Sequence, residues 1–426
     1  MRFVSTMALG LILAASGVAV VGASPAMAAK KEKAPKQNFS KEFLAQASTL
    51  QKSISSKDFA GAQSHLAAAE AAAKTPDDIY TLNILRLQLG LGLNDPKVQR
   101  AALEGMLGSG ATPPAEVGKY EFYAGDFAFK ANEPDAAIGH LQKAVAAGYP
   151  GSATHIMLAE SYFKKAVATA KGNQFTPDGK AAVQAGLPHL KQGIEVEKSE
   201  GKPVPAAWYE RGFQLAYVAG LPQASEWAMY SVEADPSAKN WRSLLRGYQD
   251  THRTISKAEN LDLMRLMRTT GSLESEYDYS EYAEAAVSSG LPGEAKAVID
   301  EGRSKGKIAP AKLSEVYQIA SGRIAGDKSS LPAGERDAAK AANGKIASST
   351  ADAYLGYGEY AKAAQLYQLA LQKGSVDANE VNTRLGIALA KSGDAAGAKA
   401  AFAKVGAGSR QDVAKFWLLW LNKQQG

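Results

Sequence analysis

The stretch from residue 351 to residue 405 decides the fold and reads ADAYLGYGEYAKAAQLYQLALQKGSVDANEVNTRLGIALAKSGDAAGAKAAFAKV. It contains two similar segments head to tail, because a pattern of one glycine followed by small and aromatic residues recurs after 35 residues. The first copy consists of Gly358, Ala363, Tyr367 and Ala370, and the second of Gly393, Ala398, Phe402 and Val405. A repeat of this length predicts a chain built from stacked units rather than around one central core.

The two segments resemble the tetratricopeptide repeat, which implies two antiparallel helices in each unit of about 34 residues. Small residues at Gly386 and Ala398 would let the two helices of a unit approach closely, with an aromatic ring beside them. The resemblance covers residues 41–405 and implies about ten helix pairs. The fold class that follows is all-α, as a right-handed superhelical solenoid of antiparallel helix pairs.

The same pattern can be followed along most of the chain. Residues 205–236 fit it well, with Gly212 at the small position of a first helix. In the preceding unit, residues 172–179 predict a swollen turn before a second helix at 188–198. The small position of the second helices then recurs after 34, 37, 68 and 35 residues, at Ala224, Ala258, Ala295, Ala363 and Ala398. Because 68 is twice 34, we expect a divergent unit, a lengthened hairpin, at residues 305–345.

The N-terminal residues have the features of an export signal. One positive residue precedes an apolar run at residues 7–21, and Ala-Met-Ala at 26–28 fits the small-x-small cleavage rule. We therefore expect residues 1–28 to be a signal peptide and the mature chain to start at Ala29. An uncleaved membrane anchor is the alternative, although the apolar run is short for one. Residues 29–40 predict a disordered basic lead.

The C-terminal residues 406–426 predict a capping helix. Ser409 with Asp412 three residues later resembles a capping box. The helix that follows is apolar on nearly every side and contains Trp417 and Trp420. We expect these rings to close the last groove of the solenoid, and a homodimer or partner contact is the alternative.

Composition argues against several functional classes. The chain has no cysteine, and four of its six net positive charges lie in residues 1–36, so no basic face for nucleic acid is expected. Residues 302–307, GRSKGK, lack the spacing of a phosphate loop. No metal-ligand spacing connects the five histidines, His65, His140, His155, His189 and His252. We therefore expect no enzyme activity, no metal and no cofactor.

The resemblance also implies a binding surface on the first helices, which line the concave groove of this family. In the register set by Gly125, Ala159 and Gly212, Lys130 and Lys164 lie beside aromatic residues and would favour an acidic or C-terminal peptide. The alternative is that the rings pack as core. The expected groove residues are Phe122, Asp126, Phe129, Lys130, Ile156, Glu160, Phe163, Lys164, Tyr209, Phe213 and Tyr217.

Together these features predict an exported, non-catalytic scaffold of the bacterial cell envelope that binds a protein or peptide through the concave groove. The location would be periplasmic, outer-membrane-associated or secreted, with no transmembrane span after signal cleavage. Alternatives are a helical-repeat subunit of an envelope enzyme or wall-polymer hydrolase, and an outer-membrane secretion accessory. No stretch outside the repeats is long enough to be a catalytic domain. The oligomeric state stays open.

Overall fold

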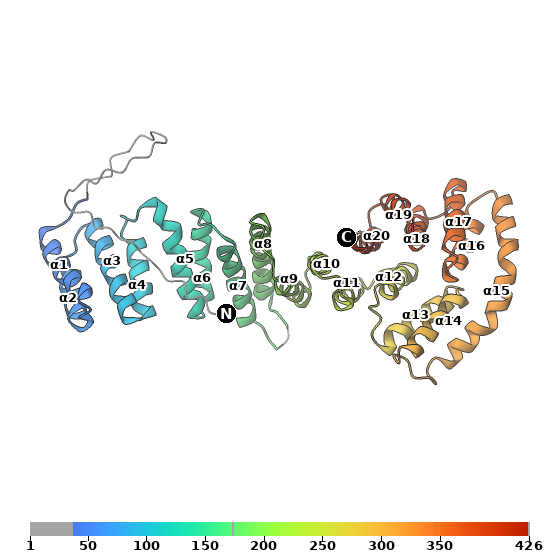
Figure 1. The fold of residues 1–426 in the computed structure, drawn as a ribbon, viewed down its shortest axis with the longest axis horizontal. Helices are drawn as coiled ribbons and strands as arrows, with labels where there is room; N and C mark the ends of the chain where they lie inside the picture. Colours follow the sequence, from blue (N-terminus) through green and yellow to red (C-terminus); the bar gives the residue numbers. More distant parts are fainter. Residues whose placement is uncertain (1–36, 173, 425–426) are drawn as a thin grey trace.

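The computed structural model describes residues 37–172 and 174–424, and within them the chain forms 20 α-helices and a single isolated bridge between Lys171 and Gln174. The first ten helices are α1 (Lys41–Ser55), α2 (Phe59–Ala72), α3 (Pro76–Leu93), α4 (Pro96–Gly108), α5 (Pro114–Lys130), α6 (Pro134–Ala146), α7 (Ser152–Ala168), α8 (Pro177–Ser199), α9 (Ala206–Ala219) and α10 (Ala224–Ala234). The other ten are α11 (Ala238–Thr251), α12 (Lys257–Thr269), α13 (Glu276–Ser288), α14 (Pro292–Ser304), α15 (Ser314–Lys340), α16 (Lys345–Gly356), α17 (Tyr360–Lys373), α18 (Ala378–Lys391), α19 (Ala395–Phe402) and α20 (Ser409–Lys423). The predicted all-α solenoid of antiparallel helix pairs is confirmed (Figure 1).

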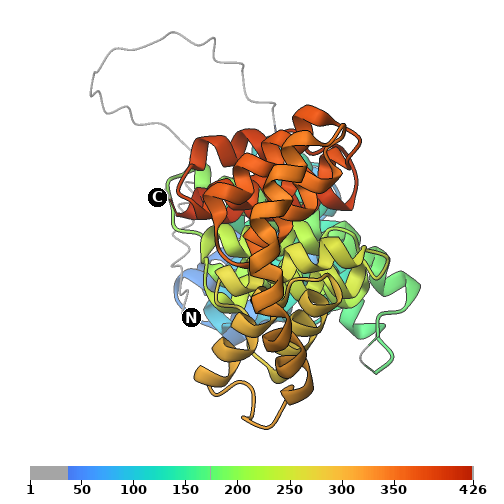
Figure 2. The same cartoon turned by 90° about the vertical axis from the view of Figure 1, so that its right-hand side faces the viewer.

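The helices form a straight row and a closed ring, and α11 connects the two. Helices α1 to α10 follow one another in the row, whereas α12 to α20 curve round until α20 lies against α10 and α12 (Figure 1). Seen from the end, the ring stands in front of the row (Figure 2). We call α12 to α20 the C-terminal ring.

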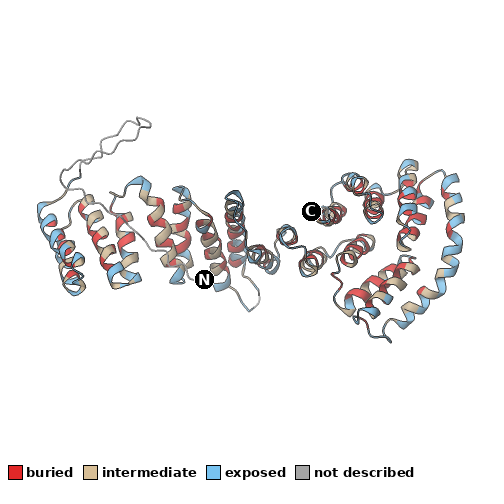
Figure 3. Ribbon diagram, in the orientation of Figure 1, coloured by how far each residue is buried: buried red, intermediate tan, exposed pale blue. Residues whose placement is uncertain are grey.

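The apolar core follows this division. The row contains four separate apolar clusters, each shared by neighbouring helices, as expected where a unit contacts only the next one. One continuous cluster instead extends from Ala228 to Leu421 through the C-terminal ring. Buried residues accordingly face the spaces between helices, and exposed residues lie on the outer surfaces (Figure 3).

Local sequence signals explain where many helices begin. Thr75, Ser256 and Ser275 each form a capping box with the acidic residue three positions later, which satisfies amide groups of the first helical turn. Several helices also begin with a proline, as α4 and α6 do at Pro96 and Pro134. Proline suits this position because the first amide of a helix has no partner within the helix.

Small residues hold the paired helices close together, as predicted. A Cβ built at Gly212 of α9 would lie 2.3 Å from Trp227 of α10, and one at Gly386 of α18 would lie 2.5 Å from Phe402 of α19. Ala398 has no exposed surface. The aromatic rings therefore occupy the space that any larger side chain would need.

Two regions differ from the sequence-based expectation: the helix expected at residues 188–198 begins earlier, inside the turn expected at 172–179, and the hairpin expected at 305–345 is mainly one helix. Helix α8 begins at Pro177, where the Thr176 hydroxyl accepts the amide N–H of Gly179, and it continues through Pro188 to Ser199. Residues 305–345 form mainly α15, a 27-residue helix with Pro332 inside it. In both cases proline does not end the helix, and in the second case the long helix joins two sides of the ring (Figure 1).

The C-terminal helix also differs from its predicted local structure. Gly408 is the residue before α20, and Ser409 is the first helical residue, so the expected capping box does not form. The Ser409 hydroxyl instead donates to the Glu259 carboxylate of α12. Trp417 is fully buried and donates its indole N–H to the Asp262 carbonyl oxygen at 3.2 Å. The helix therefore closes the ring on α12 as well as covering the last repeat.

The predicted signal peptide, residues 29–36 of the basic lead and the last two residues lie outside the described residues. The Asn38 amide donates to Asp77 at 2.6 Å, and the Ser40 amide donates to Asp78 at 3.1 Å. The predicted disorder therefore does not extend to Ser40, because the start of α3 holds this segment. No helix in the described ranges combines the length and the apolar composition needed to cross a bilayer.

Candidate functional site

The predicted groove residues lie on α5, α7 and α9, the first helices of three successive pairs. Nine of the eleven keep at least partly exposed side chains. Phe163 and Tyr209 are buried, with 0% and 5% of their surface exposed, so these two rings belong to the core between helices. We call the other nine residues the row strip: Phe122, Asp126, Phe129, Lys130, Ile156, Glu160, Lys164, Phe213 and Tyr217.

Contacts between α5 and α7 tie the first part of the row strip together. The Lys164 ammonium lies 3.7 Å from the centre of the Phe129 ring and donates to the Phe129 carbonyl oxygen at 2.9 Å. Lys130 forms an ion pair with Asp126 at 2.5 Å. Both lysines, which were expected to attract an acidic peptide, therefore already have partners within the row. Phe122 stacks on Tyr149 with ring centres 4.9 Å apart.

Between α7 and α9, one ion pair connects the strip across the helices. The Arg211 guanidinium approaches the Glu160 carboxylate at 3.2 Å and lies 5.7 Å from the centre of the Phe163 ring. Phe163 itself packs against Gly186 of α8, where an added Cβ would lie 2.6 Å from the ring. Ile156 fits against Gly193 of the same helix in a similar way.

The last part of the strip contacts α11. Phe213 and Tyr217 have ring centres 5.7 Å apart and lie beside Gly247. The Tyr217 hydroxyl donates to the Asp250 carboxylate at 2.8 Å. Tyr209 of the same helix lies beneath Lys198, whose ammonium is 5.7 Å from its ring centre. The alternative of core packing thus holds for Tyr209, while Tyr217 remains 36% exposed.

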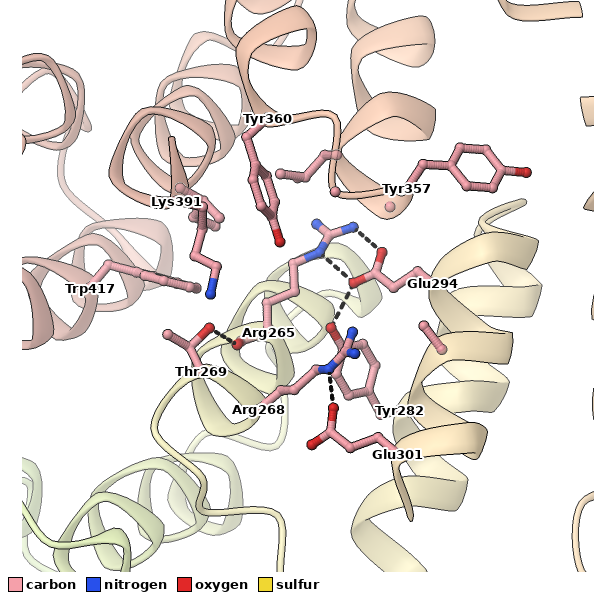
Figure 4. A pocket seen from close by; sticks show the side chains of 15 residues that line it. Arg265, Arg268, Thr269, Tyr282, Glu294, Glu301, Tyr357, Tyr360, Lys391 and Trp417 are labelled. Atoms are coloured by element: carbon pink, nitrogen blue, oxygen red, sulfur yellow. Dashed lines mark hydrogen bonds and ion pairs between the residues drawn. The ribbon is translucent and has the colours of Figure 1, made fainter. Parts of the chain in front are cut away.

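A second candidate site lies inside the C-terminal ring and was not predicted. A cavity of about 370 Å³ opens between α12, α13, α14, α18, α20 and the loop between α16 and α17. We call it the ring pocket (Figure 4). Its labelled lining residues are Arg265, Arg268, Thr269, Tyr282, Glu294, Glu301, Tyr357, Tyr360, Lys391 and Trp417.

Arg265 and Glu294 form the buried side of the ring pocket. Two guanidinium nitrogens of Arg265 donate to the Glu294 carboxylate at 2.8 and 2.7 Å, and the Tyr282 hydroxyl donates to the same group at 2.6 Å. Burial alone would raise the pKa of Glu294, but the charge and hydrogen bonds of Arg265 outweigh it and lower the pKa. Burial raises the pKa of the Tyr282 hydroxyl, so this side of the pocket stays in one charge state near neutral pH.

Arg268 and Lys391 form the opposite side of the ring pocket. Arg268 donates from Nε to Glu301 at 2.6 Å. Lys391 lies at the end of α18, and among the described residues its ammonium has neither a hydrogen-bond acceptor nor an ion-pair partner. Partial burial of the amine, followed by the charge of Arg268, lowers the pKa of Lys391.

Beneath the pocket, the carboxylate of Asp262 of α12 forms ion pairs with three arginines. Arg265 donates to it at 2.6 Å, Arg384 of α18 lies 3.4 Å away, and Arg410 of α20 also donates to it. Arg384 bonds Asp352 of α16 as well, at 2.9 Å. This network connects four helices of the ring and holds the pocket's floor in place.

Sequence reasoning missed the ring pocket for an identifiable reason. The run from Leu261 to Met267 is otherwise apolar but contains Asp262 and Arg265 three residues apart. Charges on such a helix indicate a buried ion pair. No pattern in the sequence indicates that Lys391, more than 120 residues later, faces the same space.

Comparisons with known proteins add little. No protein-family model matches the chain, and no curated protein matches it. Among solved structures, yeast Tom70 is 12% identical over 90% of this chain and 96% of its own, with a TM-score of 0.24. The maize pentatricopeptide repeat protein PPR10 is 14% identical over 88% of this chain and 61% of its own, with a TM-score of 0.27. The P58(IPK) TPR domain is 12% identical over 90% of this chain and 99% of its own, with a TM-score of 0.23. At these TM-scores the similarities carry no argument about function. No group of three or more potential metal ligands occurs within the described ranges.

Proposed function

We propose that this protein is a non-catalytic helical-repeat scaffold of the bacterial cell envelope that binds an extended segment of a partner protein along the row strip. The observation that supports this is the continuity of the strip. Nine predicted residues keep exposed surface on three successive first helices, and side-chain contacts connect each helix to the next. The proposed export rests on the signal-like residues 1–28, and the periplasm or outer membrane is the expected location.

The chemistry of the row strip specifies a partner with apolar and charged side chains. Four rings, those of Phe122, Phe129, Phe213 and Tyr217, offer apolar area, and aromatic residues often provide most of the binding energy at an interface. Charges of both signs alternate between them. An acidic or C-terminal peptide would have to displace the Asp126 carboxylate from its ion pair with Lys130. Binding should therefore weaken as salt concentration rises, but only modestly.

Site-specific crosslinking in intact cells tests this proposal. A photo-crosslinking residue placed at Lys130 or Tyr217 should capture one discrete partner. The same residue at Lys143 of α6, which is exposed on a second helix, should not. Equal capture at all three positions, or none at the first two, would contradict binding on the row strip. Identification of the captured partner as a wall-polymer hydrolase, another envelope enzyme or a secretion component would distinguish the alternative roles.

Matched variants are needed to separate a loss of binding from a loss of folding. Phe129→Ala and Phe213→Ala remove partly exposed rings and should reduce crosslinking at Lys130 and Tyr217 by about ten-fold or more, because truncation of a binding ring costs about 2 kcal/mol. Circular dichroism should show near-normal melting. Retained crosslinking with a large fall in melting temperature would place these rings in the core and the binding surface elsewhere.

A further inference from the structure

Two cations on one side of the ring pocket have unused hydrogen-bonding capacity. Arg268 uses Nε on Glu301, and among the described residues its two terminal nitrogens have no acceptor. Among the described residues the Lys391 ammonium has no hydrogen-bond acceptor, and it points into the pocket (Figure 4). The arginines around Asp262 differ in this respect, because Arg265 and Arg384 bond at least two carboxylates each.

The charges that line the ring pocket do not balance. Arg265, Arg268 and Lys391 are positive, whereas Glu294 and Glu301 are negative and are already bonded by two of those cations. The Lys391 side chain keeps exposed surface and the Arg268 side chain is 33% exposed, so both cations are open to a ligand from solvent. Pairing Lys391 with the ring's own residues would require a third carboxylate on this wall, and the described lining residues contain none. The site therefore has room and charge for one anion.

The remaining walls fit a small molecule. The Tyr360 hydroxyl extends into the pocket beside Arg265, and among the described residues it has no hydrogen-bond partner (Figure 4). Tyr357 and Trp417 lie on opposite sides of the pocket, and the Tyr357 ring points away from it, with its hydroxyl donating to Asp327 at 2.6 Å. A volume of about 370 Å³ lies near the lower end of the range for small-molecule sites, which is roughly 300–1,000 Å³. Residues of seven helices of the ring, α12, α13, α14, α16, α17, α18 and α20, border the space.

We propose that the ring pocket binds a small organic anion, whose carboxylate or phosphate oxygens accept hydrogen bonds from Arg268, Lys391 and the Tyr360 hydroxyl. Guanidinium and ammonium groups are the usual partners of such oxygens, and bonds between charged groups are stronger than neutral ones. The rest of the ligand lies beside the Tyr360 side chain. This site uses none of the row strip, so it stands independently of the proposed scaffold function.

Calorimetric titration of the mature chain, residues 29–426, tests the proposal with succinate and sulfate as probes. Succinamide has nearly the size of succinate but no charge. Succinate or sulfate should bind and raise the melting temperature, and succinamide should do neither. Absence of binding by both anions would overturn the proposal, as would equal binding of succinate and succinamide. If a peptide with a free C-terminus binds while neither small anion does, the ligand is a protein terminus and the proposal is also overturned.

Two variants locate the binding in the ring pocket. Lys391→Met removes the charge and should weaken succinate binding by about ten-fold or more, since a hydrogen bond to a charged group contributes about 1.5–3 kcal/mol. Lys404→Met is the control, because it removes the same charge from an exposed position after α19 and should leave binding unchanged. Equal loss in both variants would indicate a general charge effect and overturn the proposal.

Tyr360→Phe removes only one hydroxyl and keeps the ring in place, so it decides the matter if Lys391→Met fails to fold. It should weaken succinate binding by about three-fold or more, because a neutral hydrogen bond contributes about 0.5–1.5 kcal/mol. Wild-type affinity in a folded Lys391→Met protein, or in Tyr360→Phe when that is the variant available, would show that the anion binds elsewhere. Crosslinking at Lys130 should remain normal in these variants.

Discussion

Asp262 of α12 and Arg410 of α20 form a buried ion pair although they are 148 residues apart in the sequence. Asp262 has no exposed surface, and Arg265 and Arg384 approach the same carboxylate. Each of these charges would be costly to bury alone, so the network forms only when α12, α18 and α20 meet. The pair therefore connects the two ends of the C-terminal ring and positions the wall of the ring pocket.

Removal of one partner from this ion pair should destabilise the ring. We expect Arg410→Met to lower the free energy of unfolding by about 3–5 kcal/mol, because it leaves the Asp262 carboxylate buried with fewer partners. Urea unfolding followed by circular dichroism measures the effect. Lys130→Met is the control, since it breaks the exposed pair with Asp126 and should change stability by about 1 kcal/mol or less. Similar values for the two variants would show that the buried network does not hold the ring closed.

Ring stability should depend on pH through the same carboxyl group. Burial alone would raise the pKa of Asp262, but Arg384, Arg410 and Arg265 outweigh it and lower the pKa to about 2. The usual value in unfolded chains is about 3.9, so the group contributes stability that is fully present above that pH and is lost as the pH falls towards 2. Urea unfolding at pH 7, 4 and 3 should show this decline. An Asp262→Asn protein should be less stable at pH 7 and lose less on acidification, and an unchanged pH profile would contradict this assignment.

Close contact between paired helices should make Gly212 intolerant of even one added carbon. Its Cβ would lie 2.3 Å from the Trp227 ring, so we expect Gly212→Ala to cost about 1–3 kcal/mol through overpacking. Gly139 of α6 is the matched control, because its Cβ would meet no atom within 4 Å. Gly139→Ala should be neutral or stabilise the helix by up to about 1 kcal/mol. Thermal melting compares the two, and equal effects would show that the α9–α10 contact is looser than described.

The two ends of the aromatic face on α9 should respond differently to truncation. Tyr209→Ala should cost about 3–5 kcal/mol of stability, because this ring is almost fully buried among α8 and α9 residues. Tyr217→Ala should cost about 1 kcal/mol or less, because the ring is 36% exposed and loses one hydrogen bond to Asp250. Chemical unfolding measures both. A larger loss for Tyr217→Ala would mean that its contact with α11 belongs to the core and is not a free surface.

Export should leave a defined mature N-terminus. The apolar run and Ala-Met-Ala at residues 26–28 predict cleavage after Ala28. The intact mass of protein isolated from the periplasmic fraction should therefore match a chain that starts at Ala29. Replacement of Ala26 and Ala28 with bulky residues should block cleavage and leave the precursor in the inner membrane. A full-length mass for the wild-type protein in the membrane fraction would support an uncleaved anchor.

The repeat architecture could be predicted from sequence because its determinants are local. Gly212 and Ala398 recur with the unit: Gly212 packs against Trp227 of the same helix pair, and Ala398 is fully buried. Such spacing is visible along the chain. Burial is not visible in this way: the pattern places Phe163 and Tyr209 at groove positions, but residues of α8 cover both rings. The small residue that makes room for Phe163 is Gly186, on a helix whose beginning the sequence does not indicate correctly.

Closure of the ring and formation of its pocket depend on contacts between residues about 120–150 positions apart. Arg384 and Arg410 each look like an ordinary charge on an amphipathic helix until α15 turns the chain and α20 returns to α12. Periodicity specifies which face of a helix is buried, but not which distant face covers it. The sequence thus determines the units and their order, whereas the partners of the buried charges, and the cavity beside Lys391, arise only from the way the completed chain packs.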